Sequence, residues 1–160
     1  KEGAKTLNYL AEHGIDSYEA LGDRLAELNA TMDDSLASIK AVEGRIAELN
    51  LIAKYAATYR KCRPVYNRYR KSGDKEKFLR GHESEIILFE VAARELKRLG
   101  AVPLPVAENL EAELKELTAQ KGTLYAQYTA AKRQAKEYDT IKRNLDVLLP
   151  PEQSITHELE

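Results

Sequence analysis

Basic and tyrosine side chains are interleaved over residues 54–80, which we call the basic segment. It contains ten Lys and Arg residues but only two acidic residues, a net charge of about +8. Lys and Arg neutralise phosphates and tyrosine rings stack on unpaired bases, so this mixture is typical of grooves that bind single-stranded nucleic acid. The candidate DNA-binding residues are therefore Arg60, Lys61, Arg63, Tyr66, Arg68, Tyr69, Arg70, Lys71, Lys75 and Lys77.

The basic segment also has a purely structural interpretation. Its cations can form surface ion pairs with acidic residues later in the chain, and tyrosines at helical spacing usually belong to a core. The acidic residues concerned are Glu83, Glu85, Glu90, Glu108, Glu111 and Glu113. The sequence leaves both interpretations open.

Other kinds of chemistry find little support in the residue pattern. The three histidines, His13, His82 and His157, lack the spacing of metal ligands. Cys62 lies between two basic residues but has no histidine partner with a known catalytic signature, and the glycines form no phosphate-binding loop. We therefore expect no catalytic residue, no metal and no cofactor, and we expect that the chain is not an enzyme.

The composition favours a helical protein. Of 160 residues, 43% are apolar and 32% charged, with only eight Gly and five Pro, which disfavours disorder and turn-rich β structure. A single Cys excludes a disulfide within the chain, and no apolar run of about 18 residues is present to span a bilayer. We expect a cytoplasmic all-α protein without membrane insertion.

Two apolar series with alternating steps of three and four residues predict long helices over residues 17–62 and 105–149. In the first series only Ser35 is polar, and Leu36 beside it can compensate. The first series is Tyr18, Leu21, Leu25, Leu28, Met32, Ser35, Ile39, Val42, Ile46, Leu49, Ala53 and Ala56. The second is Leu110, Leu114, Leu117, Lys121, Leu124, Tyr128, Ala131, Ala135 and Tyr138, continued by Ile141, Leu145 and Leu148.

The ends of the first long helix carry separate signals. Asp16 and Glu19 have the spacing of a capping box, which places the helix start beside them. Pro64 has no N–H to donate, so it either kinks this helix or begins a new one.

Shorter helices are expected over residues 5–13, 64–72 and 83–99, of which those between about Pro64 and Leu99 are expected to pack at one end of the long pair. Together these elements predict a single helical domain over residues 1–149. Residues 150–160 are expected to be a tail with a vector-derived end, because the chain closes on Leu-Glu and starts without Met, as a fragment does.

The distribution of charge predicts that the long helices pair in opposite directions. Net charge is about −6 over residues 12–50, +8 over 54–80, −4 over 81–117 and +3 over 118–149. An antiparallel arrangement sets acidic against basic stretches, whereas a parallel one sets acidic stretches side by side. We therefore predict an elongated antiparallel coiled-coil hairpin, formed within one chain or swapped between two.

Six segments form a recognisable pattern when they are taken in order: Lys5 to Tyr18, Tyr66 to Gly73, Lys77 to Leu79 with His82-Glu83, Leu104-Pro105, Tyr125 to Tyr128 and Ile141 to Leu149. This pattern resembles the C-terminal helical region of relaxases from conjugative elements of Firmicutes, the relaxase/mobilisation nuclease proteins. The chain departs from the family's pattern at Arg63-Pro64, where the family has an Asp-containing helix without proline.

The resemblance implies a role in conjugative DNA transfer. Relaxases of this type nick DNA with a separate N-terminal nuclease domain, so no catalytic residue carries over to this chain. The resemblance implies a non-catalytic accessory domain with DNA at a transfer origin as its partner. The alternative is a coiled-coil module for self-association, as a homodimer, or for docking to relaxosome or coupling proteins.

Overall fold

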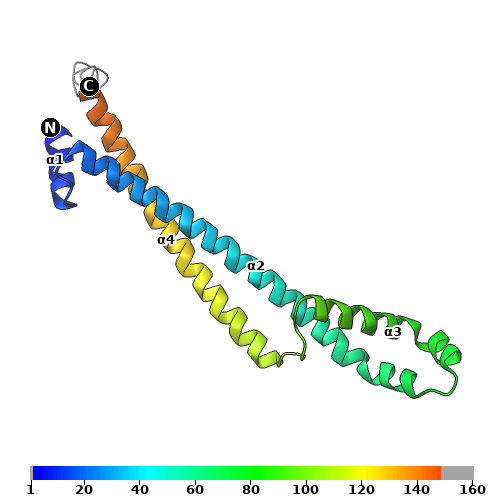
Figure 1. Ribbon diagram of the computed structural model, residues 1–160. Helices are drawn as coiled ribbons and strands as arrows, with labels where there is room; N and C mark the ends of the chain where they lie inside the picture. The colour runs from blue at the N-terminus through cyan, green and yellow to red at the C-terminus, as the bar shows by residue number, and fades with distance from the viewer. Residues whose placement is uncertain (1, 149–160) are drawn as a thin grey trace. The chain divides into compact units, whose positions relative to one another are not determined.

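The computed structural model describes residues 2–148, and within this range the protein is all α, as predicted. It contains α1 (Glu2–Glu12), α2 (Tyr18–Lys71), α3 (Lys75–Arg98) and α4 (Ala107–Leu148), and no strand (Figure 1). The tail predicted over residues 150–160, and residue 149 before it, lie outside the described residues.

Contacts divide the chain into two compact units, which α2 and α4 both enter. Among the described residues, unit 1 comprises residues 2–39 and 122–148, and unit 2 comprises residues 40–121. Each unit has its own cluster of buried apolar side chains. The candidate DNA-binding residues all belong to unit 2.

The long helices α2 and α4 pack against each other in opposite directions, as the charge distribution predicted. In unit 2, Glu43 pairs with Lys121 at 3.2 Å and Arg45 pairs with Glu113 at 3.0 Å. The later residue of α2 thus pairs with the earlier residue of α4, as expected for antiparallel helices. In unit 1, Tyr18 at the start of α2 donates a hydrogen bond to Asp146 near the end of α4. Opposite charges thus meet across the pair.

Unit 1 is closed by the turn between α1 and α2. Its buried cluster joins Leu10, Ile15, Leu21 and Tyr138, which come from α1, the turn, α2 and α4. Gly14 ends α1 with a φ of 70°, and Ile15 N–H donates to the Leu10 carbonyl at 2.8 Å, the Schellman pattern that favours glycine.

The start of α2 corrects the predicted capping box. The cap is Ser17, whose hydroxyl accepts a hydrogen bond from the Ala20 N–H at 3.0 Å, and not Asp16. Either residue type suits the position, so composition alone did not separate two adjacent candidates.

Unit 2 is built where α2, the end of α3 and the start of α4 meet. Its buried cluster consists of Leu49, Ile52, Ala56, Leu96, Ala101 and Leu110. Gly100 ends α3 with a φ of 71°, and Ala101 N–H donates to the Leu96 carbonyl at 2.8 Å, repeating the arrangement at Gly14.

The separate helix expected over residues 64–72 does not exist, because α2 runs without interruption through Pro64 to Lys71. Proline removes one backbone hydrogen bond, the one that residue 64 would donate to the carbonyl of Arg60. Cys62 and Val65 on either side of Pro64 are buried, and Tyr66 stacks on Phe89 of α3. Packing against α3 therefore holds the helix where propensity alone predicts a break.

The helix expected over residues 83–99 is present as the larger part of α3. Asp74 caps α3 by accepting a hydrogen bond from the Lys77 N–H at 3.1 Å, and a first helical stretch follows. His82 then has non-helical dihedral angles, φ −136° and ψ 24°, which join that stretch to the longer one.

The apolar series predicted for α2 is buried or half-buried except at Tyr18, which is 41% exposed, and the compensation expected at Ser35 does not occur. Ser35 is buried although polar, whereas Leu36, expected to replace it, is 45% exposed. The helical period fixes which residue faces α4, so a neighbour about 100° away around the helix does not take its place.

Candidate nucleic-acid interface

The basic segment is brought together by the turn between α2 and α3. The last part of α2 and the first part of α3 lie side by side in Figure 1, joined by residues 72–74. Ser72 and Asp74 order this turn, since the Ser72 hydroxyl donates to the Asp74 carbonyl at 3.1 Å and accepts from its N–H at 3.3 Å. All ten candidate residues thus lie on two adjacent helices.

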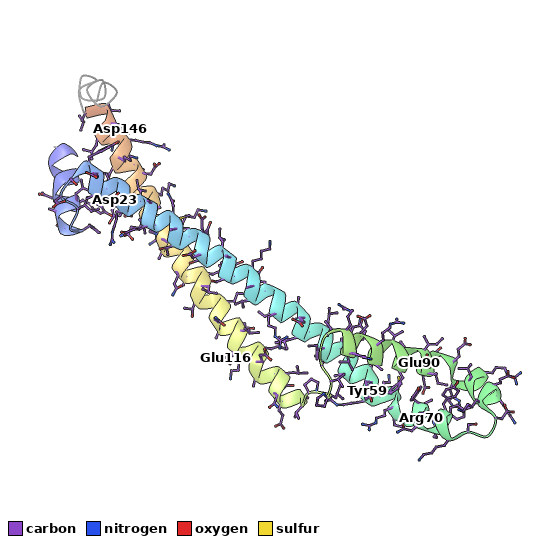
Figure 2. The ribbon with its side chains drawn as sticks, viewed as in Figure 1. Asp23, Tyr59, Arg70, Glu90, Glu116 and Asp146 are labelled. Atoms are coloured by element: carbon purple, nitrogen blue, oxygen red, sulfur yellow. The ribbon has the colours of Figure 1, made fainter. Side chains whose placement is uncertain are left out.

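The basic candidates are all exposed. They are Arg60, Lys61, Arg63, Arg68, Arg70 and Lys71 on α2, and Lys75 and Lys77 on α3. Figure 2 shows Arg70 near the end of α2, beside the turn. Their charged groups are therefore accessible from solvent.

These cations are not neutralised by carboxylates. Across residues 2–148, no Lys or Arg of the basic segment has an ion pair within 4.0 Å. Glu113, one of the acidic residues expected to absorb the charge, pairs with Arg45 instead. The unpaired net charge of about +8 is the main electrostatic feature of unit 2.

Three of the arginines are held by contacts other than ion pairs. Arg60 donates a hydrogen bond to the Pro105 carbonyl at 2.7 Å, which ties α2 to the segment before α4. The guanidinium carbons of Arg63 and Arg68 each lie 5.9 Å from a ring centre, that of Tyr59 and that of Phe78 respectively. Cation–π contact keeps the charge while limiting side-chain motion.

The aromatic side chains between the two helices form a continuous series of ring contacts, which we call the ring ladder. Consecutive centroids along it are 4.6, 4.2, 6.0, 6.2 and 4.2 Å apart. Its members in order are Tyr59, Phe89, Tyr66, Tyr69, Phe78 and His82. Figure 2 shows Tyr59 where α2 adjoins α3.

The ladder changes the role of the two tyrosine candidates. Tyr66 and Tyr69 are half-buried, and each already has aromatic neighbours within the protein. These ring contacts favour the structural interpretation for the tyrosines, while the unpaired cations argue against it for the charges. Phe89 was missed as the central ring, although its spacing with Ile86 and Leu96 on α3 marks it as inward-facing.

Elsewhere, strong hydrogen bonds shift the pKa of three side chains. Burial first, and then the hydrogen bond to Glu137 at 2.7 Å, raise the pKa of Tyr9 well above its ordinary value. The hydrogen bond to Asp146 raises the pKa of Tyr18, and the hydrogen bond to Glu113 raises that of Arg45. None of these groups belongs to the basic segment.

The remaining candidate chemistry has no cluster to support it in the described chain. No three His, Cys, Asp or Glu side chains among residues 2–148 gather as metal ligands. Cys62 is buried, with 4% of its surface exposed. None of the four helices in this range is long and apolar enough to cross a bilayer.

Comparison with family models, with curated proteins and with solved structures finds no significant match to this chain.

Proposed function

We propose that this chain is a non-catalytic accessory domain of a conjugative relaxase, and that its basic segment contacts DNA at the transfer origin. The proposal rests on the ten Lys and Arg residues of the basic segment, which are all exposed and have no carboxylate partner in the described chain. Neutralising phosphates releases condensed counterions from DNA, so a surface of this kind gains affinity without base contacts.

The relaxase part of the proposal rests on the sequence resemblance. In that setting the nicking chemistry belongs to a nuclease domain, and this domain holds the DNA near it in the cytoplasm. No bond is made or broken by the residues of the basic segment, whose part is to bind and orient.

Fluorescence anisotropy with labelled DNA tests the proposal directly. We expect a dissociation constant of roughly 1–100 µM at about 50 mM salt, weakening more than tenfold at about 200 mM. Arg68, Arg70 and Lys71 are replaced together by Glu, and we expect at least a tenfold loss of affinity at the lower salt concentration. A second variant with Gln at these positions separates loss of charge from repulsion at the end of α2.

A matched control changes the net charge equally in unit 1. Lys132, Arg133 and Lys136 are exposed on α4, and their replacement by Glu should leave the affinity within about threefold. Equal losses in both triple variants would show that binding follows net charge alone. Absence of binding by the unaltered chain at low salt would overturn the proposal.

Docking to another protein is the second candidate, favoured by two adjacent exposed apolar residues. Ile87 and Leu88 on α3 are 48% and 51% exposed, on a helix whose other large apolar residues mostly face α2. Partners in this case are relaxosome or coupling proteins, or a second copy of the chain. Light scattering that finds a stable dimer, dissociated by Ile87→Ser with Leu88→Ser and lacking DNA affinity, would favour this candidate.

A further inference from the structure

The ring ladder bears on which form of nucleic acid the basic segment binds, an inference that rests on the proposed function. Tyr66 stacks on Phe89 with centroids 4.2 Å apart and planes 22° apart. Tyr59 lies 4.6 Å from the same ring. Phe89 is only 7% exposed, so its contacts with these two tyrosines belong to the packing of α3 on α2.

On the face of Tyr66 that stacks on Phe89, a base can bind only by replacing a ring contact within the protein. Tyr69 contacts Tyr66 and Phe78 with centroids 6.0 and 6.2 Å away, and both tyrosines are half-buried. Exchanging one stacking partner for another gives little net gain, so the stacked rings give unpaired bases little advantage at this surface.

Unlike the stacked rings, the basic side chains near the turn between α2 and α3 can contact a ligand without breaking an ion pair. Arg70 and Lys71 on α2 and Lys75 and Lys77 on α3 are exposed, and none has an ion pair in the described part of the chain. From Arg60 to Lys71 the basic face of α2 extends about 16 Å, which matches the axial length of about five base pairs. Duplex DNA carries one charge per about 1.7 Å of axis, against about 3.4 Å for one strand.

We infer that the basic segment binds the sugar–phosphate backbone of duplex DNA and leaves the bases unread. The rings fix α3 on α2, and the cations on the two helices contact phosphates. Binding of this kind is independent of sequence and does not require melted DNA.

Three labelled ligands of equal length test the inference with the full chain: a duplex of about 20 base pairs, a single strand of thymidines and a single strand without bases. At about 50 mM salt we expect the duplex to bind at least threefold more tightly than either single strand. The two single strands should agree within about twofold, because only the bases distinguish them.

The outcomes separate this inference from the proposed function. If the thymidine strand binds about tenfold more tightly than the strand without bases, stacking occurs and the inference is wrong, while DNA binding stands. If the single strands bind as tightly as the duplex, the preference for duplex is wrong. If no ligand binds, the proposed function fails as well.

A pair of variants adds a second readout. Tyr66→Leu removes the stacking face but keeps an apolar side chain, and Tyr66→Phe keeps the ring, so circular dichroism of both checks the fold. We expect each to bind all three ligands within about twofold of the unaltered chain. A tenfold loss in Tyr66→Leu alone, confined to the thymidine strand, would overturn the inference.

Discussion

Tyrosines play different roles in the two units. In unit 1 the hydroxyls of three tyrosines form hydrogen bonds: Tyr9 donates to Glu137, Tyr18 donates to Asp146, and Tyr138 accepts from Gln134 at 3.1 Å. In unit 2 the tyrosines of the ring ladder are engaged through their rings, and the described residues give their hydroxyls no hydrogen-bond partner.

The difference follows from the charges that surround each group. Unit 1 brings acidic side chains from α4 to the tyrosines of α1 and α2, so each phenol finds an acceptor. The basic segment has only two acidic residues, so its tyrosine hydroxyls lie among cations and find no carboxylate acceptor. These tyrosines stabilise the protein through the packing of their rings. Stability should therefore depend on pH in unit 1 and on ring packing in unit 2.

The largest expected effect is loss of the central ring of the ladder. Phe89→Ala should lower the free energy of unfolding by about 3–5 kcal/mol, because it removes a buried ring and both of its tyrosine contacts. Phe89→Leu keeps most of the volume and should cost less than half as much. Hydrogen exchange along α3 measures both costs. A cost of Phe89→Leu close to zero would show that the ring contacts add nothing, and a cost equal to that of Phe89→Ala would show that the ring contacts outweigh the buried volume.

An intermediate effect should appear at the glycines that end α1 and α3. Gly14 and Gly100 have φ values of 70° and 71°, so Ala at either position should destabilise the protein by about 1–2 kcal/mol. This cost should be the same in both units, because it arises from the backbone and not from the surroundings.

Two helical glycines provide the control for that prediction. A Cβ at Gly122 in unit 1 or Gly44 in unit 2 would meet no atom within 4 Å, so Ala should stabilise each helix by about 0.5–1 kcal/mol. Urea unfolding distinguishes the signs. Stabilisation by Ala at Gly14 or Gly100 would contradict the left-handed helix ends.

The smallest effect tests the tyrosine comparison most directly. The pKa of Tyr9 is raised above its ordinary 10.0, so its contribution to stability is complete below about pH 10 and is lost as pH rises through the folded-state pKa. Tyr9→Phe should cost about 1 kcal/mol or less at neutral pH and weaken the loss of stability at alkaline pH. Thermal unfolding from about pH 8 to 11 measures this.

Tyr66→Phe is the matched variant in unit 2. It removes a hydroxyl without a described acceptor and leaves the ring contacts, so at neutral pH it should cost less stability than Tyr9→Phe. Equal losses in thermal stability for the two variants at neutral pH would show that the hydroxyls of the two units do not differ.

Much of the fold was predictable because it depends on periodicity and charge. The apolar series located both long helices, and the distribution of charge gave the antiparallel direction. Pro64 misled the prediction, since local propensity cannot register the packing of Tyr66 on Phe89, a contact across 23 residues of sequence. Ser35 shows the opposite case, in which the helical period overrides polarity.

The residues of the candidate site could be predicted from the sequence, but the pairing of its cations and the stacking of its tyrosines could not. Composition identified the basic segment, yet whether its cations would be paired depended on where α3 and α4 placed their carboxylates. The stacking of the tyrosines depended on Phe89, which lies outside the segment. Contacts between elements decided both questions, and such contacts leave no signal within the segment itself.

The unpaired cations of the basic segment have a consequence for how the protein behaves in solution. Its formal charge of −1 is the sum over segments of opposite sign, among them an acidic stretch of about −6 over residues 12–50 and a basic one of about +8 over residues 54–80. Chromatographic retention follows local charge density, so at neutral pH the protein should adsorb to anion and cation exchangers alike. The isoelectric point of about 6.4 reflects the average composition and describes neither the acidic stretch nor the basic one.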